Sequence, residues 1–361
     1  MTAAAVAPPE VAPVRPGEEL DWPRLEAYLR AQMPELVGDF SVLQFPNGSA
    51  NLTYLVRIGD TPLVVRRPPF GLLAPRSHDM RREHRVLSAL HPVYDRAPRS
   101  PLFSDDPSVI GADFLVVEYR PGVVVWGAVP PEMADHADLG RRIGLAVVDA
   151  IADLHLVDPT APAIAALGRP DGFLERQLTG WTERWQLVAP ATGAELMHAV
   201  SGRLAATRPS SQRVSVLHLD PKVDNCQFDP ADPDRVRSVF DWDMATLGDP
   251  LVDLGMLLGY WPDPSDTADE HALVVPGQEA LGLPTRAEVV ARYAERCSTD
   301  LEVLPWYEAF ACWRTAVVLQ QLHHRYLRGE TSDERMATRG DLVPALARRA
   351  TSILDSWRND A

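Results

Sequence analysis

Residues 40–67 form three short β-rich runs separated by turns, and this segment restricts the fold more than any other part of the chain. The first run ends at residues 46–49, where Asn-Gly between two β-rich runs is typical of a hairpin turn. The second run ends at Gly59-Asp60, and residues 62–66 form the third run. The pattern predicts a small antiparallel meander near the start of the chain.

A helix with one acidic residue on its apolar face is expected next, beginning at Ser77 as N-cap. The residues of that face are spaced three, four and three positions apart: Met80, Glu83, Leu87 and Leu90. Burying the Glu83 carboxylate is costly unless a cation meets it, and the third β-rich run supplies Arg66 or Arg67. One of these arginines is the expected partner. The alternative is that Glu83 lies at the edge of the face and stays solvated.

The rest of the chain changes from β-rich to helical at a cluster of helix and strand breakers. A β-rich run at 114–119 ends at residues 120–122 (Arg-Pro-Gly), and most later segments have helical spacing. The fold class indicated is α+β, with a small antiparallel-sheet lobe containing one helix and a larger, mainly helical lobe. The expected organisation is a loose, disordered Ala/Pro tail at 1–20, the small lobe at 21–121 and the helical lobe at 122–361.

The charge balance and the usage of lysine and cysteine exclude several functional classes. With 35 basic and 50 acidic residues the net charge is −15, which argues against a broad surface for nucleic acid or anionic membrane. The three cysteines form no CxxC pair, so their spacing supports neither a disulfide framework nor a four-ligand zinc site. The single lysine, Lys222, does not follow a glycine, which excludes a Walker-type phosphate loop. Without a signal peptide or a long apolar run, a cytoplasmic protein is expected.

A short segment in the second half of the chain carries the clearest chemical pattern. Residues 218–225 have the spacing His-x-Asp-x-x-x-x-Asn, which is typical of the catalytic loop of kinases. Two short strands are expected after it, at 226–228 and 236–240, and Asp241 follows the second. Because strands fix the positions of the loops between them, a hairpin of this kind can hold acids and an amide against a common point.

Three polar residues of this segment, together with Asp241, have roles to expect in phosphoryl-transfer chemistry. Asp220 accepts a proton from the attacking hydroxyl group, and Lys222 offers a positive charge to the transferring phosphoryl group. Asn225 and Asp241 supply the oxygen ligands that magnesium prefers. The alternative is that Asp220, Asn225 and Asp241 only cap turns, as Asp and Asn often do.

Four further residues are expected to serve packing rather than chemistry. His155 ends a helical segment, where its ring is expected to bond to the last carbonyl groups of the helix. Large aromatic residues dominate protein cores, so packing is also the expected role of Trp181, Trp185 and Trp261. Lining of a substrate cleft by these tryptophans is the alternative.

Several longer motifs give the chain a resemblance to a known family. They comprise residues 45–54, 82–87, 218–225, 240–250 with Asp253, 306–310 and 326–329. With them the chain resembles the aminoglycoside phosphotransferase family, a branch of the protein-kinase-like fold, from about Asp21 to the C-terminus. It is most similar to the subgroup whose members also occur fused to acyl-CoA dehydrogenases.

The resemblance implies a bilobal, protein-kinase-like enzyme that uses ATP, or GTP, with Mg²⁺. It implies transfer of the γ-phosphoryl group to a hydroxyl of a small molecule, with Asp220 as catalytic base and with Asn225 and Asp241 as magnesium ligands. Residues 21–121 are then the nucleotide-binding lobe, and residues 122–361 contain the catalytic loop and the acceptor site.

The resemblance also implies which residues contact the nucleotide. The loop from Asn47 to Asn51 covers the phosphates, Arg66 paired with Glu83 steadies the α- and β-phosphates, and the backbone of Glu118 to Arg120 forms the hinge that holds the base. The full set is Asn47, Gly48, Ser49, Asn51, Arg66, Glu83, Glu118 and Tyr119.

Two residues depart from the pattern of the resembled family. Leu219 stands where the family usually has glycine, and Arg66 stands where kinases usually have lysine, whose compact ammonium differs from a planar guanidinium. A nucleotide-binding pseudokinase scaffold with weak or no catalysis is therefore the alternative function. The acceptor is left open between an aminoglycoside and a metabolic hydroxyl or hydroxyacyl compound, with a slight preference for the metabolic compound. The choice between monomer and dimer is also open.

Overall fold

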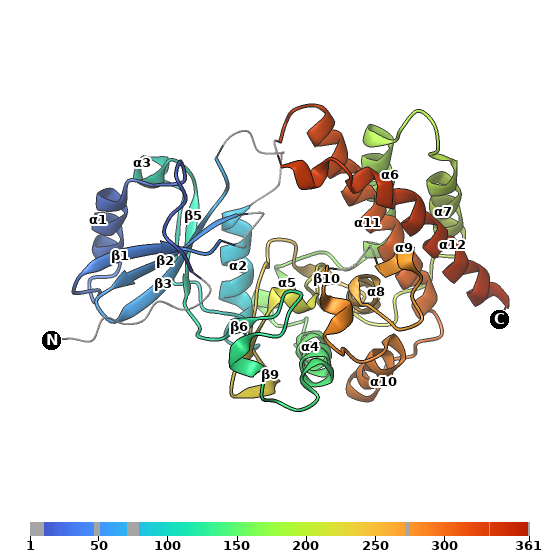
Figure 1. Cartoon of the computed structure of the whole chain (residues 1–361), viewed down its shortest axis with the longest axis horizontal. Helices are drawn as coiled ribbons and strands as arrows, with labels where there is room; N and C mark the ends of the chain where they lie inside the picture. Colours follow the sequence, from blue (N-terminus) through green and yellow to red (C-terminus); the bar gives the residue numbers. More distant parts are fainter. Residues whose placement is uncertain (1–10, 47–50, 71–78, 272–274, 332, 360–361) are drawn as a thin grey trace. The chain divides into compact units, whose positions relative to one another are not determined.

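The three β-rich runs near the start of the chain are strands in the computed structural model (Figure 1). They are β1 (Phe40–Gln44), β2 (Leu52–Ile58) and β3 (Thr61–Arg67), and they pair as an antiparallel meander. β5 (Phe114–Glu118) pairs with β3, and β4 (Leu102–Ser104) pairs with β5, both antiparallel. The sheet order is β1-β2-β3-β5-β4, and the predicted meander is confirmed.

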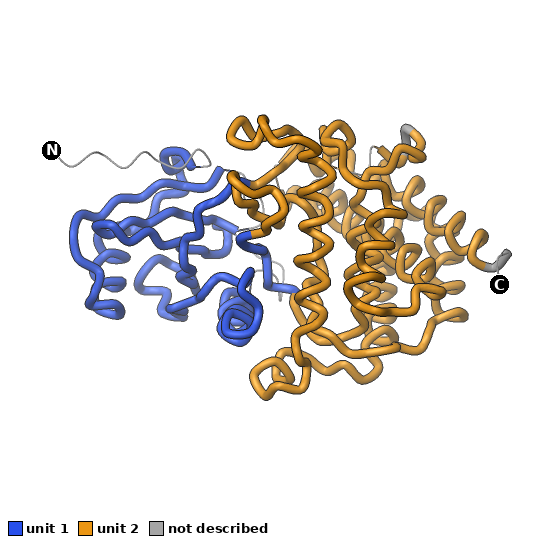
Figure 2. Tube along the Cα trace, turned by 90° about the horizontal axis from the view of Figure 1, so that it is seen from below, with its two compact units in different colours: residues 1–123, 237–244 blue, residues 124–236, 245–361 orange. Residues whose placement is uncertain are grey.

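The chain separates into two compact units, which Figure 2 distinguishes by colour. The structure describes residues 11–46, 51–70, 79–271, 275–331 and 333–359. Unit 1 contains the chain up to Val123 together with Arg237–Met244, and unit 2 contains Val124–Val236 and Ala245–Ala361. The five-stranded sheet belongs to unit 1, and most helices belong to unit 2, so the expected α+β class is confirmed.

One hydrophobic core of unit 1 lies between a face of the sheet and two helices. α1 (Trp22–Gln32) begins at Asp21, whose side chain accepts a hydrogen bond from the Arg24 backbone N–H, and it buries Leu25 and Leu29 in the core. The core side of β2 presents alternate residues, because side chains of a strand point to opposite faces in turn. These core residues include Tyr54, Val56 and Ile58. The short helix α3 (Pro107–Ile110) contributes Val109 and Ile110.

The helix of unit 1 that carries Glu83 has its N-cap two residues after the predicted cap. α2 (Met80–Leu90) is capped by Asp79, whose carboxylate accepts a hydrogen bond of 2.9 Å from the Arg82 backbone N–H. The predicted cap, Ser77, lies outside the described residues. Serine and aspartate are both good N-caps, so the sequence pattern does not distinguish Ser77 from Asp79. The predicted apolar face is confirmed, since all four of its residues are buried: Met80, Glu83, Leu87 and Leu90.

Residues 11–20, which composition assigned to a loose tail, make ordered contacts with the sheet. Ala12 forms an antiparallel bridge with Gln44 at the outer strand, and the Tyr54 hydroxyl donates a hydrogen bond of 2.6 Å to the Glu18 carbonyl oxygen. The edge strand β1 has backbone groups that no other strand satisfies, and this segment pairs with some of them. Composition alone does not reveal such a partner.

Unit 2 is mainly helical, with short strands that carry the chemical motif. Its longer helices are α4 (Leu139–His155), α6 (Phe173–Val188), α7 (Glu195–Ala206), α8 (Leu251–Tyr260), α10 (Arg286–Cys297), α11 (Leu304–Leu327) and α12 (Val343–Asn359). The shorter helices are α5 (Pro162–Ala165) and α9 (Ala268–His271). The strands after the boundary are β6 (Val123–Val124), β7 (Ser215–Leu217), β8 (Cys226–Asp229), β9 (Asp232–Val239) and β10 (Thr246–Gly248), and the turn η2 (Val223–Asn225) precedes β8. The predicted strand pair after the motif is confirmed as β8 and β9.

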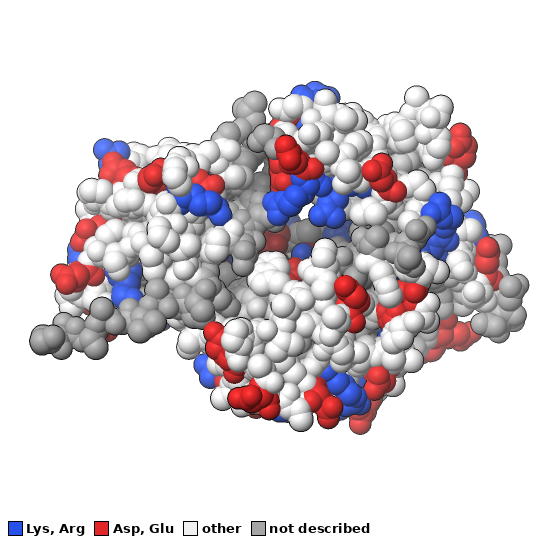
Figure 3. Space-filling model, in the orientation of Figure 1, with Lys and Arg blue, Asp and Glu red and all other residues white. Residues whose placement is uncertain are grey.

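On the face drawn in Figure 3, groups of basic side chains alternate with acidic and uncharged ones. Among the described helices, none combines the length and the apolar composition needed to span a bilayer.

A glycine on α8 allows this helix to approach α11 closely. A Cβ atom added at Gly255 would lie 2.6 Å from the Tyr307 carbonyl oxygen, which is backbone and cannot move aside easily. We expect Gly255→Ala to lower the free energy of unfolding by about 1–3 kcal/mol, measured by urea denaturation. The matched control is Gly259→Ala on the same helix, where the added Cβ would meet the Ala311 Cβ at an ordinary 3.7 Å. Equal destabilisation by both variants would contradict the packing argument.

Candidate active site

The kinase-type motif forms a tight loop in unit 2 between β7 and β8. The Lys222 ammonium lies 2.9 Å from Asp220 Oδ2. The Asn225 amide nitrogen donates hydrogen bonds to the Asp220 carboxylate at 3.1 Å and to its backbone carbonyl at 2.9 Å. The loop thus brings three of the predicted site residues together: Asp220, Lys222 and Asn225.

A left-handed residue gives this loop its shape. Leu219 has φ of 68°, a conformation that costs a non-glycine residue about 1–2 kcal/mol. Glycine adopts this conformation freely, which is the physical reason that glycine suits the position. The Leu219 side chain is buried, and burial of a leucine contributes about 1.5–3 kcal/mol, so burial offsets the cost of the backbone strain.

One buried carboxylate holds this strained backbone in place. Asp253, in the first turn of α8, accepts hydrogen bonds from the backbone N–H groups of His218 at 2.6 Å and Leu219 at 2.8 Å. The His155 ring lies 3.2 Å from the same carboxylate through Nε2, and its Nδ1 lies 2.7 Å from the Tyr293 hydroxyl. The carboxylate and the imidazole are fully buried. Asp253 therefore acts as a positioning residue for the loop that carries Asp220.

The position of His155 corrects the prediction made for it. Its ring was expected to bond to helix-end carbonyls, but it joins Asp253 on α8 to Tyr293 on α10. His155 lies on the buried face of α4, so its ring turns inward to the core. The two partners are 98 and 138 residues away in the sequence, and no local pattern predicts them.

We expect Asp253→Asn to destabilise unit 2 and to lower kcat. An asparagine side chain has one acceptor oxygen where the carboxylate has two, so a buried donor loses its partner at a cost of about 1–3 kcal/mol. Urea denaturation measures this loss, and steady-state kinetics of the phosphoryl transfer that the sequence motif predicts measures kcat.

A matched control for this variant is Asp249→Asn. Asp249 is equally buried and bonds to the Leu251 N–H and the Tyr307 hydroxyl, but, within the described part of the chain, to no residue of the loop 218–225. We expect Asp249→Asn to lower the free energy of unfolding and to leave kcat unchanged. Equal losses of kcat in both variants would argue against a positioning role for Asp253.

Electrostatics keep the loop residues charged. Burial pushes the pKa of Asp220 upward, but the Lys222 ammonium, together with His218 and Arg314, more than compensates and leaves this pKa below its ordinary value. Burial lowers the pKa of Lys222, but the carboxylates of Asp220 and Asp224 raise it by more. The pKa of Lys222 therefore lies above its ordinary value. At neutral pH Asp220 is therefore an ionised carboxylate that can accept a proton.

A second group of predicted residues lies in unit 1. The Arg66 guanidinium forms an ion pair with Glu83, and its Nη2 atom lies 3.5 Å from Asp241 Oδ1. The Glu83 side chain is only 1% exposed, so the alternative of a solvated Glu83 is wrong, and Arg66 is the expected cation. Asp241 follows β9 and has φ of 66°. Burial, with Asp241 and Asp243, raises the pKa of Glu83 to about 7, although Arg66 acts to lower it.

The remaining predicted residues lie at the ends of strands in unit 1 or outside the described residues. Asn51 is buried immediately before β2. Glu118 ends β5, accepts a hydrogen bond from the Arg99 backbone N–H at 3.2 Å and forms an ion pair with Arg120. Tyr119 follows it. Asn47, Gly48 and Ser49 lie outside the described residues.

Two of the predicted residues, one in each unit, offer oxygen atoms of the kind that magnesium binds. The Asn225 amide nitrogen is used by Asp220, and within the described chain the amide oxygen of Asn225 has no hydrogen-bond partner. The Asp241 carboxylate is about one-third exposed, at 31%. Both atoms are hard oxygen donors, and magnesium commonly takes one or two protein oxygens with phosphate oxygens and water.

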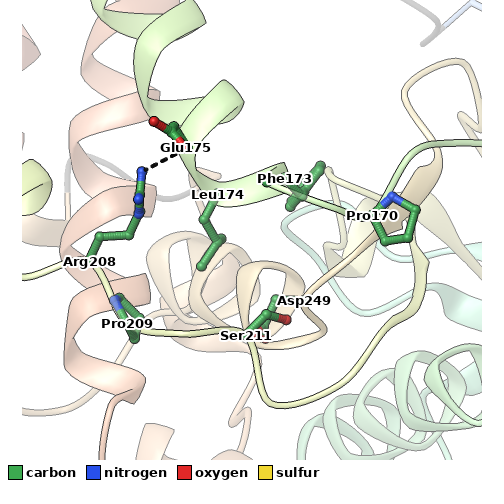
Figure 4. Close-up of a pocket in the computed structure, with 9 residues that line it drawn as sticks. Pro170, Phe173, Leu174, Glu175, Arg208, Pro209, Ser211 and Asp249 are labelled. Atoms are coloured by element: carbon green, nitrogen blue, oxygen red, sulfur yellow. Dashed lines mark ion pairs between the residues drawn. The ribbon is translucent and has the colours of Figure 1, made fainter.

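The cavity drawn in Figure 4 is separate from these residues. It lies at the start of α6 and is lined by Phe173, Leu174, Arg208 and Asp249, among others. Its volume of about 130 Å³ is below the roughly 300–1,000 Å³ of typical ligand pockets. None of the predicted site residues lines it, so it is not the candidate active site.

Comparisons with known proteins connect this geometry to a family. A family model described as the phosphotransferase enzyme family matches residues 41–295. Acyl-CoA dehydrogenase family member 11 of Rattus norvegicus is 30% identical over 348 residues, which are 92% of this chain and 43% of the relative. The mouse acyl-CoA dehydrogenase family member 10 is 29% identical, over 95% of this chain and 32% of the relative. The chain thus spans less than half the length of these relatives.

Solved structures show the same fold. A Ralstonia eutropha protein, provisionally assigned as an aminoglycoside phosphotransferase, is 26% identical with a TM-score of 0.77, over 94% of this chain and 99% of that one. A thermostable mutant of the aminoglycoside phosphotransferase APH(4)-Ia, in a ternary complex with AMP-PNP and hygromycin B, has a TM-score of 0.56 over 92% of this chain and 98% of that one. At 15% identity, the second likeness shows the fold alone.

Proposed function

The chain belongs to the phosphotransferase enzyme family, and we propose that it transfers the γ-phosphoryl group of ATP or GTP to a hydroxyl group of a small molecule, with Mg²⁺. The family resemblance drawn from the sequence motifs is confirmed, including the likeness to proteins named as acyl-CoA dehydrogenases. The observation that carries the proposal is the loop in which Lys222 and Asn225 both contact the Asp220 carboxylate.

In this proposal Asp220 is the catalytic base. As the acceptor oxygen forms its bond to the γ-phosphorus, the hydroxyl proton passes to the Asp220 carboxylate, and the bond to the leaving nucleoside diphosphate breaks. The Lys222 ammonium neutralises negative charge on the transferring group, where charge accumulates. Positioning and charge neutralisation supply most of the acceleration.

Asn225 and Asp241 are the proposed magnesium ligands, through the amide oxygen and the carboxylate. When bound, the ion neutralises phosphate charge and orients the nucleotide. In unit 1, Arg66 held by Glu83 pairs with the α- and β-phosphates, and the segment from Asn47 to Asn51 covers them. The backbone of Glu118 and Tyr119 holds the base.

In this proposal residues 21–121 bind the nucleotide and residues 122–361 bind the acceptor. The protein acts in the cytoplasm. APH(4)-Ia, with AMP-PNP and hygromycin B in one complex, has the same fold, and this supports a nucleotide and a small molecule as ligands. A small hydroxylated metabolite is the proposed acceptor class.

The test is transfer of phosphate to a set of hydroxylated acceptors. The purified chain is incubated with ATP or GTP, Mg²⁺ and sugars, amino alcohols, hydroxy acids and aminoglycosides, and mass spectrometry detects the phosphorylated product. A phosphorylated acceptor and one equivalent of nucleoside diphosphate are expected. If nucleotide raises the melting temperature only with Mg²⁺, and no acceptor is phosphorylated, the chain is a nucleotide-binding scaffold instead.

A further inference from the structure

Three helices of unit 2 place aromatic and basic side chains beside the catalytic loop. Tyr260 ends α8, and the Lys222 ammonium lies 5.9 Å from the centre of its ring. Burial raises the pKa of Tyr260 to about 12; Asp220 raises it too, whereas Arg314 and Lys222 lower it. The phenol therefore lies close enough to Asp220, Lys222 and Arg314 to interact with their charges. Arg314 lies on α11.

Two arginines of this region contact the same tryptophan. The guanidinium carbon of Arg314 lies 4.8 Å from the Trp181 ring centre, and that of Arg184 lies 4.4 Å from it. The Trp181 indole N–H donates a hydrogen bond of 3.2 Å to the Gln177 side chain one turn earlier on α6, which fixes the ring. Trp181 is buried, as packing predicted, but it also holds two cations near each other.

The two arginines differ in their surroundings. Arg314 is 4% exposed, and its Nη1 atom lies 3.0 Å from the Met256 sulfur. Arg184 is exposed, and among the residues that the structure describes no carboxylate forms an ion pair with it. One positive charge thus lies in the protein interior and a second lies next to it in contact with solvent.

The carboxylates of Asp220 and Asp253 oppose the positive charge of Arg314. Burial lowers the pKa of Arg314; Tyr260, Asp220 and Asp253 raise it, and Arg184 lowers it, as expected of a nearby positive charge. Interior charges are screened less by water than surface charges are, so Arg314 acts over a longer distance. Arg184 has no such carboxylate partner among the described residues, so it is the charge of this pair that attracts anions and repels cations.

We propose that Trp181, Arg184 and Arg314 form an anion subsite of the acceptor pocket, and that the acceptor carries a carboxylate or phosphate group in addition to its hydroxyl. The hydroxyl end of this assignment rests on the proposed function, because Asp220 must receive it. Anion binding at the subsite does not depend on catalysis. The subsite selects against aminoglycosides, whose several ammonium groups would meet the two guanidinium groups.

The first test compares acceptors of equal length and different charge. The set contains ω-hydroxy acids of three to eight carbons, their primary amides, the corresponding amino alcohols and the corresponding hydroxyalkyl phosphates. At the best chain length kcat/KM is expected to be highest for an anion, lower for the amide and lowest for the amine. The acid and phosphate arms tell which anion the subsite takes. A preference for the amine at every length would overturn the proposal.

The second test removes one charge of the pair. Arg184→Gln is expected to raise KM for the preferred anion about 10- to 100-fold and to leave KM for the amide unchanged, because a charge-assisted hydrogen bond is lost. The matched control is Arg141→Gln, which removes an exposed arginine that pairs with Glu288 on α10. An anion preference that survives Arg184→Gln, or that Arg141→Gln also removes, would overturn the proposal.

A binding test separates this proposal from the proposed function. Alkyl carboxylates of the same lengths, or alkyl phosphates, should raise the melting temperature of the wild-type chain and of Arg141→Gln, but not of Arg184→Gln. If no acceptor is phosphorylated while this pattern is seen, the kinase proposal fails and the anion subsite stands. If acceptors are phosphorylated while neither anion raises the melting temperature of the wild-type chain, the subsite fails alone.

Discussion

Replacing Asp220 by asparagine is expected to lower kcat for phosphoryl transfer by about 10²- to 10⁴-fold, the range for loss of a general base. Asparagine has nearly the same shape, and its amide oxygen can still accept the hydrogen bond that Asn225 now donates to the carboxylate. It cannot accept the hydroxyl proton at neutral pH. Nucleotide binding should persist, because the proposed nucleotide contacts are other residues. Single-turnover kinetics and calorimetric titration with nucleotide measure the two quantities.

The matched control for this variant is Asp234→Asn. Asp234 is also in unit 2, but its side chain is 61% exposed and pairs with Arg142 at 2.7 Å, away from the catalytic loop. This control should retain kcat. A wild-type kcat in Asp220→Asn would remove the base from the mechanism, and a loss of nucleotide affinity equal to the loss of kcat would point to a structural role instead.

Local patterns predicted the parts of this fold that depend on neighbours in the sequence. The hairpin turn signals identified β1, β2 and β3, because a turn of few residues fixes antiparallel pairing. The helical spacing placed Glu83 on a buried face, and the cost of burying a carboxylate then called for a nearby cation. Arg66 supplies it. The spacing from His218 to Asn225 similarly brought the three loop residues together.

Local sequence patterns do not predict contacts between segments that are distant in the chain. β10 pairs with β7, and Asp253 bonds to the backbone of the catalytic loop 34 and 35 residues before it. Only the folded chain brings the His155 ring between the Asp253 carboxylate and the Tyr293 hydroxyl. The two arginines at Trp181 come from helices more than one hundred residues apart in the numbering, so packing of α6 against α11 creates their proximity. The sequence predicts Trp181 as a core residue, but no pattern in it predicts the contacts with Arg184 and Arg314.

Arg66→Met is expected to destabilise unit 1 by about 3–5 kcal/mol, because it leaves the buried Glu83 carboxylate without its cation. The loss depends on pH. Burial raises the pKa of Glu83 to about 7 in the folded chain even with Arg66 lowering it, against 4.5 as the ordinary value, and loss of Arg66 raises the folded pKa further. The folded state then binds more protons than the unfolded state, so stability falls as pH rises from 4.5 through the folded pKa. The destabilisation should be larger at pH 8 than at pH 6.

The double variant Arg66→Met with Glu83→Met separates stability from nucleotide binding. Replacing both members of a buried ion pair by apolar residues is often neutral, so most of the stability should return and its pH dependence should shrink. Nucleotide affinity should stay low, because no cation is left for the α- and β-phosphates. Hydrogen exchange of the α2 and β3 amides reports the stability of unit 1, and calorimetric titration reports affinity. If affinity returns together with stability, Arg66 holds Glu83 in place without contacting nucleotide. If stability does not return, burial of Glu83 is not the source of the loss.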